Sequence, residues 1–315
     1  MHEKAVEPQP ALPMAQPRVA TSDPLYALVA GGGQTLSTVD KEATIELLAE
    51  RGAVLFRGFR TSLEEFVEFT SSFCSQFLEH GSKELRPRRS GDGTVAQVLI
   101  GHGSVALHAE MFYSPVRPDA LWFYCTKPAG RGGETLIADS RDLLARLSAS
   151  SRKLLETRRL RYRHVMTPEL WKYNTKQAEV GQAAMLLNFV PNVTATVLEG
   201  DNLQMDFETE AIRPTGRSGE PGFINSIANV MEYTERTTTQ VTFADGEPLP
   251  EGVIADILQA NAAGQQRIPW QPHDVMLIDN SRMLHGRAAF EEGDVRTIDV
   301  RFGVLAPQYK LRELH

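Results

Sequence analysis

The segment DVMLIDNSRMLHGR (residues 274–287) joins a strand-like apolar run to a histidine across a short polar turn. Six other runs are similarly short and rich in β-branched or aromatic residues, and turns that carry glycine or proline separate them. These runs occupy residues 94–100, 120–125, 134–139, 222–227, 239–244 and 296–305. The pattern indicates a β-rich core.

Helical patterns interrupt the strands at residues 140–147, 150–160 and 251–264. Short strands with helices between them predict a mainly β fold with flanking helices. The expected architecture is a double-stranded β-helix, or jelly-roll barrel, with the helices packed outside it.

The N-terminal part of the expected domain begins with a helix and a strand. The run after Asp40 has helical periodicity and stops at Gly52, and a strand-like run, residues 53–59, follows. Next, Ser62 and Glu65 form a capping box at the start of a second helix. Phenylalanines recur at helical spacing along it, and we expect them to be core residues: Phe66, Phe69, Phe73 and Phe77.

Composition sets the class of protein. The chain has 315 residues, of which 42% are hydrophobic and 23% charged, as in an ordinary globular protein. Residues 1–22 contain four prolines and little periodicity, so we expect a disordered tail followed by a single domain, residues 23–315. Cys74 and Cys125 both lie in apolar sequence, which favours buried thiols over a disulfide framework.

The net charge and the hydropathy pattern argue against nucleic acid and against a membrane as partners. The formal net charge of -7 opposes general binding to nucleic acid, because phosphates would be repelled. The sequence shows neither a long apolar run nor a signal-peptide pattern, so no membrane partner is expected and a cytoplasmic location is the default.

A candidate metal site emerges from three residues. In VALHAEMF (residues 105–112), strand alternation would turn His108 and Glu110 to the same face. A third ligand must come from elsewhere, and His285, after a strand and a turn, is the best candidate. Two histidines and one carboxylate leave coordination positions open, which suits an iron(II) oxygenase. An H-x-E tripeptide alone is weak evidence, and we assign His102, His164 and His273 to ordinary structural roles.

The last predicted strand, VRTIDVRFG (residues 295–303), is expected to bury one arginine. Alternation places Arg296 on the apolar face with Ile298 and Val300, and turns Arg301 outward. A buried guanidinium requires a counter-anion. That anion is either an internal carboxylate, Asp279 or Glu134, or a carboxylate of bound 2-oxoglutarate, which a guanidinium binds in bidentate fashion.

These motifs resemble the taurine dioxygenase and clavaminate synthase superfamily of iron(II)/2-oxoglutarate oxygenases, and within it the syringomycin-type amino-acid hydroxylases. The resemblance covers residues 40–305, through GAVLFRGF (52–59), HAE (108–110), GGETLIAD (132–139), DGEPLP (245–250) and DNSRMLHGR (279–287). It implies Fe(II) held by His108, Glu110 and His285, with 2-oxoglutarate and O2 as co-substrates. It also implies that Thr135 and Arg296 bind the distal carboxylate of 2-oxoglutarate.

Departures from the family pattern narrow the activity. A second arginine binds the sulfonate in taurine dioxygenase, and Val300 stands at that position, so taurine is not the expected substrate. Halogenating relatives lack the acidic ligand, whereas Glu110 is present. His273 replaces the usual glycine of a W-x-P-G-D motif. Hydroxylation is the commonest outcome in the family, while desaturation, epoxidation and cyclisation stay open.

The resemblance implies a small, amino-acid-like substrate from natural-product biosynthesis, such as an antibiotic pathway, either free or tethered to an acyl or peptidyl carrier protein. A basic loop, with Lys83, Arg86, Arg88 and Arg89, is either a solvated surface loop or part of a lid for such an anionic partner. Tyr113, Trp171 and Asn225 are either pocket residues or core.

Two alternative functions are compatible with the same residues. A zinc hydrolase could employ the same three ligands, although no general base is evident. A jelly-roll binding protein could keep the fold without turnover, but complete retention of the ligands, Thr135 and Arg296 weighs against it. The oligomeric state, including a homo-oligomer, is left open by the sequence.

Overall fold

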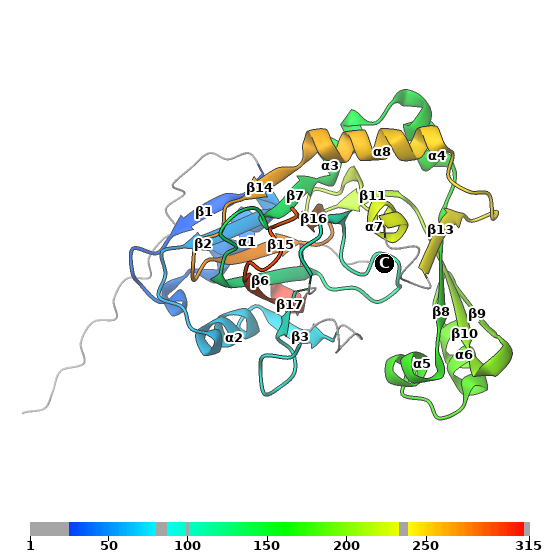
Figure 1. The fold of residues 1–315 in the computed structure, drawn as a ribbon, viewed down its shortest axis with the longest axis horizontal. Coiled ribbons are helices and arrows are strands. Elements are labelled where there is room, and N and C mark those ends of the chain that lie inside the picture. The colour runs from blue at the N-terminus through cyan, green and yellow to red at the C-terminus, as the bar shows by residue number, and fades with distance from the viewer. Residues whose placement is uncertain (1–24, 80–86, 99–100, 233–238, 312–315) are drawn as a thin grey trace, which may run out of the picture.

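The computed structural model describes residues 25–79, 87–98, 101–232 and 239–311, so the proline-rich segment 1–22 lies outside the described residues. Two β-sheets form the body of the protein (Figure 1). In the larger sheet the strands run in the order β1 (Ala27–Ala30), β2 (Ala53–Arg57), β15 (Val275–Asp279), β6 (Ala120–Lys127), β17 (Thr297–Leu305) and β3 (Cys74–Leu78), and β4 (Ala96–Gln97) also pairs with β17. The smaller sheet has the order β14 (Gln266–Ile268), β7 (Thr135–Asp139), β16 (Met283–Arg287) and β5 (Val105–His108).

The two sheets enclose a common apolar core. Leu121, Phe123 and Met276 enter it from the larger sheet, and Ile137 and Met283 enter it from the smaller one. All five side chains are at most 5% exposed. Two sheets that bury one face each against the other are the architecture of a jelly roll, so the predicted fold class is confirmed.

The outer face of the larger sheet is covered by two helices, α1 (Lys41–Arg51) and α2 (Leu63–Ser71). Their ends follow the predicted signals. Asp40 accepts a hydrogen bond from the backbone N–H of Ala43, and Gly52 ends α1 in a left-handed conformation with φ of 80°. The predicted capping box of Ser62 and Glu65 is present.

The predicted length of α2 was wrong. The helix ends at Ser71, and Phe77 lies on β3 rather than on the helix. Phe66, Phe69 and Phe73 are buried as expected. The rings of Phe69 and Phe73 pack against each other and against Trp122, and the Phe66 ring stacks on Tyr124. Phe66 and Phe69 lie on the buried face of the helix, whereas Phe73 lies in the turn between α2 and β3.

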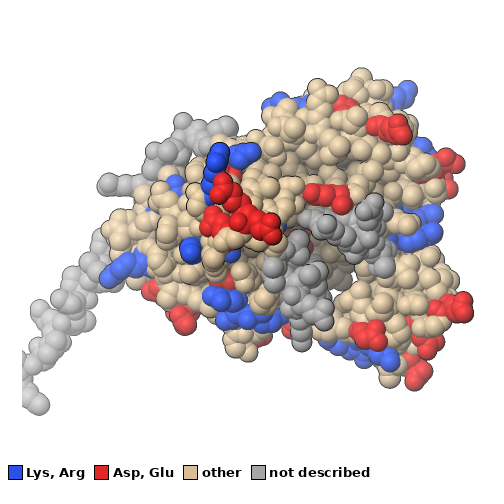
Figure 2. All heavy atoms as spheres, viewed as in Figure 1, with Lys and Arg blue, Asp and Glu red and all other residues tan. Residues whose placement is uncertain are grey.

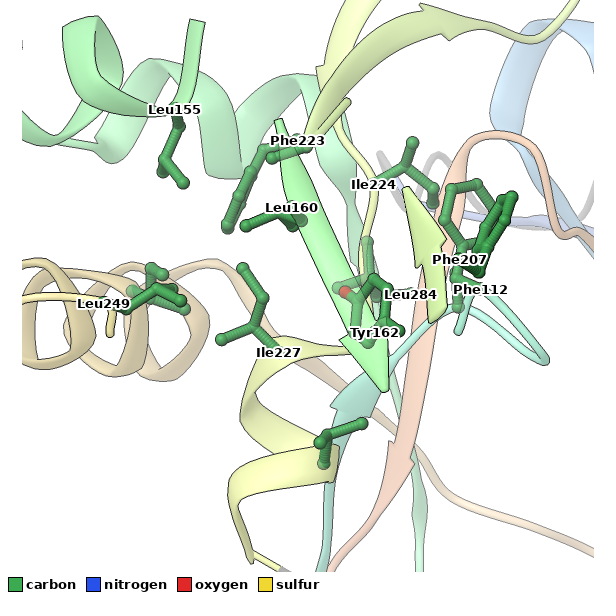
Figure 3. Packing of buried hydrophobic residues seen from close by; sticks show 14 of the residues in the cluster. Phe112, Leu155, Leu160, Tyr162, Phe207, Phe223, Ile224, Ile227, Leu249 and Leu284 are labelled. Atoms are coloured by element: carbon green, nitrogen blue, oxygen red, sulfur yellow. The ribbon is translucent and has the colours of Figure 1, made fainter. Parts of the chain in front are cut away.

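A second layer of helices covers the outer face of the smaller sheet. It contains α3 (Ser140–Arg146), α4 (Ala149–Thr157), α7 (Ile227–Glu232) and α8 (Glu251–Gly264). Figure 3 shows part of the apolar cluster on this side, where Leu284 of β16 lies near Phe112 and Tyr162. The two central strands of the smaller sheet, β7 and β16, are therefore covered on both faces and are buried at every residue.

A third sheet lies at the end of the molecule that is farthest from β1 (Figure 1). Its strand order is β13 (Thr239–Phe243), β8 (Leu160–Met166), β10 (Leu203–Thr209) and β9 (Val193–Val197), and α5 (Pro168–Thr175) and α6 (Val180–Asn188) accompany it. A separate hairpin joins β11 (Ile212–Thr215) to β12 (Glu220–Phe223), and three short 3-10 turns, at Leu36–Thr38, Glu199–Asp201 and Pro307–Tyr309, complete the described elements. Neither α5 nor α6 was predicted. Two predicted strands, residues 94–100 and 222–227, are strand over only part of their length.

Arg301 points to the outer face of the larger sheet, as predicted, but it does not reach solvent. Its side chain is 1% exposed and lies beneath α2, where Nη1 donates to the carbonyl of Val67 and to Thr70 Oγ1. Alternation correctly separates Arg301 from the inner face, but α2 buries the outer face as well.

The surface carries charged side chains of both signs. In Figure 2, basic and acidic side chains lie in small mixed groups on the face that is shown, and neither sign dominates it. Among the described residues, no helix has the length and apolar character needed to cross a membrane.

Candidate metal centre

The two predicted histidine ligands lie directly opposite each other on neighbouring strands. His108 ends β5 and His285 lies inside β16, and the two residues are register partners in the antiparallel pairing of these strands. Opposite residues of a strand pair project to the same face. Their ring centroids are accordingly 4.3 Å apart, and both side chains are 9% exposed.

Glu110 joins the histidines from a turn rather than from the strand. Because β5 ends at His108, the alternation argument for Glu110 was wrong in detail. The turn nevertheless brings its Oε2 to 3.9 Å from His108 Nε2 and 3.6 Å from His285 Nε2. One ligand atom from each of the three residues lies within 4.8 Å of the other two, and all three residues are buried. The geometry is therefore compact enough for one metal ion.

Hydrogen bonds to the backbone fix the turn that carries Glu110. The Asn280 side chain accepts from the backbone N–H of Glu110 at 2.8 Å and donates to its carbonyl at 3.1 Å. On the preceding residue, the Ala109 N–H donates to the carbonyl of Asn225 and the Ala109 carbonyl accepts from Ser226 Oγ. The position of the carboxylate is thus fixed by contacts from distant segments.

The proton on His108 is positioned for metal binding. Its Nδ1 lies 2.9 Å from the carbonyl oxygen of Ala106. Because a carbonyl can only accept, Nδ1 carries the proton and Nε2 keeps the lone pair that a metal needs. Nε2 is the atom that faces Glu110.

Gly286 allows β16 to approach β5 beside His285. A Cβ at this position would lie 2.5 Å from the carbonyl oxygen of Val105, which is closer than a side chain can tolerate. The strand register also shifts between His285 and Arg287. A larger residue would push the two histidine-bearing strands apart.

Arg296 lies against Gly133, in the segment that leads into Thr135 and β7. It is 9% exposed, and its Nε donates to the carbonyl of Gly133 at 2.7 Å. Thr135, two residues further along the chain, is 2% exposed and its hydroxyl accepts from Trp270 Nε1 at 2.9 Å. The structure therefore brings these two predicted residues into one neighbourhood, and Trp270 adds a contact that the sequence did not identify.

Neither predicted internal anion pairs with Arg296. The Asp279 carboxylate accepts from the backbone N–H and hydroxyl of Ser281, while Glu134 pairs with Arg267 at 3.3 Å. In the described part of the chain, the carbonyl of Gly133 is the one hydrogen-bond acceptor of the Arg296 side chain. Burial, and then repulsion from Arg287, lowers the pKa of Arg296 to about 10. An anionic ligand would relieve this cost.

The three histidines that we assigned to structural roles have contacts outside the candidate metal centre. His102 packs edge-on against Phe290, His164 Nδ1 lies 2.6 Å from Thr239 Oγ1, and His273 Nδ1 lies 3.1 Å from the Tyr124 hydroxyl. These contacts agree with the structural roles that we assigned to them.

Two of the three candidate pocket residues belong to the framework instead. The Trp171 indole is 1% exposed and donates to the carbonyl of Asp201. The Asn225 side chain donates to the carbonyl of Phe223 and accepts from the backbone N–H of Ile227. Tyr113 packs against the apolar cluster outside the smaller sheet.

Facing sheets with two histidines and one carboxylate between them are typical of mononuclear non-haem iron oxygenases. The sequence comparison agrees with this class. Residues 29–301 match the family described as "Taurine catabolism dioxygenase TauD, TfdA family". The chain belongs to this family, and it is a 2-oxoglutarate-dependent dioxygenase that uses Fe(II) and O2.

Individual relatives are distant but cover most of the chain. A clavaminate synthase-like protein from Arabidopsis thaliana is 28% identical, over 87% of each chain. The dapdiamide synthesis protein DdaC from Enterobacter agglomerans is 22% identical and covers 85% of this chain and 86% of its own.

Solved structures share the fold. PvcB from Pseudomonas aeruginosa has a TM-score of 0.58 at 14% identity, covering 92% of this chain and 89% of its own. A taurine dioxygenase from Burkholderia xenovorans has a TM-score of 0.59 at 16% identity, covering 93% and 94%.

Proposed function

We propose that His108, Glu110 and His285 hold the iron, that Thr135 and Arg296 hold 2-oxoglutarate, and that the enzyme hydroxylates an amino-acid-like substrate in natural-product biosynthesis. The observation that carries the proposal is the meeting of the three ligand atoms within 4.8 Å of one another. Iron(II) with 2-oxoglutarate and dioxygen supplies the power to oxidise an unactivated C–H bond.

The protein contributes a rigid set of ligands. Asn280 holds the backbone of Glu110 through hydrogen bonds, and the Ala106 carbonyl selects the tautomer of His108 that carries its proton on Nδ1. The pairing of β5 with β16 sets the positions of the two imidazole rings. Three ligands that cluster on one side leave the other coordination positions free for 2-oxoglutarate and dioxygen.

Arg296 supplies the charge for the distal carboxylate of 2-oxoglutarate. Its terminal nitrogens have no protein acceptor among the described residues, and its guanidinium is largely buried. A dicarboxylic acid that also binds the metal would end near this group, with the Thr135 hydroxyl beside it.

Two relatives support the choice of pathway. DdaC is a dapdiamide synthesis protein, and PvcB is described as an Fe, alpha-ketoglutarate dependent oxygenase from an isonitrile synthetic pathway. The position at which taurine dioxygenase has an arginine that binds the sulfonate is Val300 in this chain. Val300 is buried on the inner face of the larger sheet. An amino acid, free or attached to a carrier, suits these facts better than a sulfonate.

Anaerobic addition of Fe(II) and then 2-oxoglutarate tests the proposal. A weak visible charge-transfer band should appear, and a panel of amino acids and their carrier-bound forms should then be screened for stimulated succinate release in air. A zinc hydrolase would give no such band. Absence of both the band and succinate release would contradict the proposal.

Besides the small-molecule substrate, we propose a second partner, an acidic carrier protein that docks on the basic loop. Lys83 and Arg86 lie outside the described residues. Arg88 Nη2 lies 3.6 Å from Glu79, and Arg89 is 41% exposed and faces Asp299 at 3.4 Å. Of the two, Arg89 offers the more accessible positive charge.

The docking proposal is tested by turnover of the same amino acid in free and carrier-bound form, before and after neutralisation of the four basic residues. Loss of rate for the carrier-bound form alone is expected. Arg131→Ala, a change at an arginine with 85% side-chain exposure, is the control. Equal rates for both forms in every variant would eliminate carrier docking.

A further inference from the structure

Helix α6 carries an unusually apolar exposed surface. Phe189 is 81% exposed, Met185 60% and Leu186 44%, and Val197 of the adjacent strand β9 is 44% exposed. No residue from 180 to 198 is charged. Large apolar side chains that cluster on the surface without charges mark a contact site for another molecule.

The same segment contains an unprotected sheet edge. In the described structure β9 is the outer strand of its sheet and pairs only with β10. Edge strands are usually protected by charges, bulges or prolines, and Val193–Val197 contains no charge or proline. A protein partner that covers this corner would account for both the bare edge and the exposed helix.

The exposed surface combines a protrusion with a hollow. Phe189 stands at one end of α6, and a hollow of about 460 Å³ is lined by Gly181, Ala184, Met185, Asn188, Phe189 and Val197. A Cβ placed on Gly181 would meet nothing within 4 Å, so the space above this glycine is open.

The protruding Phe189 side chain and the open space above Gly181 lie on opposite sides of Met185, at equal spacing along α6. Gly181, Met185 and Phe189 follow one another at four-residue intervals, so they span about 80° of the helix surface and share one face. If a second α6 packs antiparallel against the first with Met185 at the two-fold axis, Phe189 of each copy lies over Gly181 of the other. Such mutual fit is the requirement for an isologous interface.

We propose that this chain forms a two-fold symmetric dimer through α6, with Met185 at the axis and each Phe189 inserted over the other copy's Gly181. A surface without charge favours a second copy as the partner, because symmetric pairing would otherwise bring like charges together. The surface is also rigid, since the Asn188 side chain bonds both the N–H and the carbonyl of Ala195 and ties α6 to β9.

Sedimentation equilibrium of the full chain at micromolar concentration tests the dimer. The unmodified protein should be dimeric, and Phe189→Asp should raise the dimer dissociation constant by about 30-fold or more, the effect of losing an interface hot spot. Gly181→Leu should weaken the dimer as well, by filling the hollow without touching the monomer's own core. The matched control is Leu258→Asp, at an apolar residue on α8 that is 51% exposed.

A cysteine at the axis tests the geometry separately. Met185→Cys should form a disulfide between two copies under mild oxidation, because only a residue near the axis meets itself, whereas Leu258→Cys should not. The native Cys125 is buried and Cys74 is partly so, and the unmodified protein serves as the blank. A monomeric unmodified protein, a dimer that survives both Phe189→Asp and Gly181→Leu, or a dimer that fails to cross-link through Met185→Cys would overturn the proposal.

Discussion

The side chain of Asn280 holds both backbone groups of Glu110, accepting from its N–H at 2.8 Å and donating to its carbonyl at 3.1 Å. Asn280 is 1% exposed and lies in the turn between β15 and β16, the turn that precedes His285. One buried amide therefore links the segments that bear the carboxylate and the second histidine.

Asn280→Ala should weaken metal binding while the fold persists. Without the amide the Glu110 turn loses its two anchors, and loss of a group that orients metal ligands typically costs about 10- to 100-fold in affinity. Titration calorimetry with Fe(II) under anaerobic conditions measures the change. Asn261→Ala, at a buried asparagine on α8, is the control and should leave affinity unaltered. An unchanged affinity in Asn280→Ala would show that the turn holds its shape unaided.

Removal of any one proposed ligand should abolish turnover. His108→Ala, Glu110→Ala and His285→Ala each leave two ligands, too few to hold the ion in place, so substrate-dependent succinate formation should vanish. Circular dichroism should match that of the unmodified protein, because each side chain faces the site rather than the core clusters. His164→Ala is the control histidine, and normal turnover in any ligand variant would remove that residue from the site.

Arg296→Ala should raise the 2-oxoglutarate requirement strongly. Loss of a buried charged partner for a carboxylate typically costs 2 kcal/mol or more, so KM for 2-oxoglutarate should rise by about 30-fold or more. The rate at saturating 2-oxoglutarate should fall much less. Arg267→Ala changes an exposed arginine near the same sheet edge and should have little effect. A KM that does not move would assign Arg296 to structure alone.

Short-range patterns predicted the fold class, and three residues that they proposed as metal ligands, His108, Glu110 and His285, lie close together in the structure. Strand alternation separated Arg296 and Val300 from Arg301. The place of His285 after a strand and a turn made it the candidate third ligand. Alternation cannot show what covers a face, so it predicted that Arg301 turns outward but not that α2 buries it.

Contacts between residues that are far apart in the chain leave no pattern in the local sequence. Asn280 and Trp270 act through hydrogen bonds to Glu110 and Thr135, residues far away in the chain, so no periodicity reveals them. Helix α6 was missed because a segment without charges lacks the polar face that normally marks an amphipathic helix.

Asp299 should make the protein less stable as pH rises. Its carboxylate is fully buried, its oxygens accept no hydrogen bond from the described residues, and burial raises its pKa to about 6 despite the attraction of Arg89. The folded protein therefore binds more protons than the unfolded chain between about pH 4 and pH 6, so the stabilising contribution is present below that range and is lost as pH rises through it.

Asp299→Asn should accordingly raise the melting temperature at pH 8 and change it little near pH 4. A pKa shift of about two units corresponds to at most about 3 kcal/mol at the higher pH. Thermal unfolding at both pH values is the measurement, with Asp142→Asn on the surface of α3 as the control. A benefit that is equal at both pH values would show that the charge of Asp299 is not the cause.

Arg301→Met should destabilise the protein although it removes a buried charge. The guanidinium donates to the Val67 carbonyl and to the hydroxyls of Thr70 and Thr94, and it lies 3.4 Å from the centre of the Phe77 ring. Methionine fills much of the volume but cannot donate to the buried Thr70 hydroxyl or to the partly buried Val67 carbonyl and Thr94 hydroxyl. Each unsatisfied group costs about 1–3 kcal/mol, so the melting temperature should fall by several degrees. Arg131→Met, at an exposed arginine, supplies the comparison. Equal melting temperatures for the two variants would mean that water replaces the guanidinium beneath α2, and that the network around Arg301 adds nothing to stability.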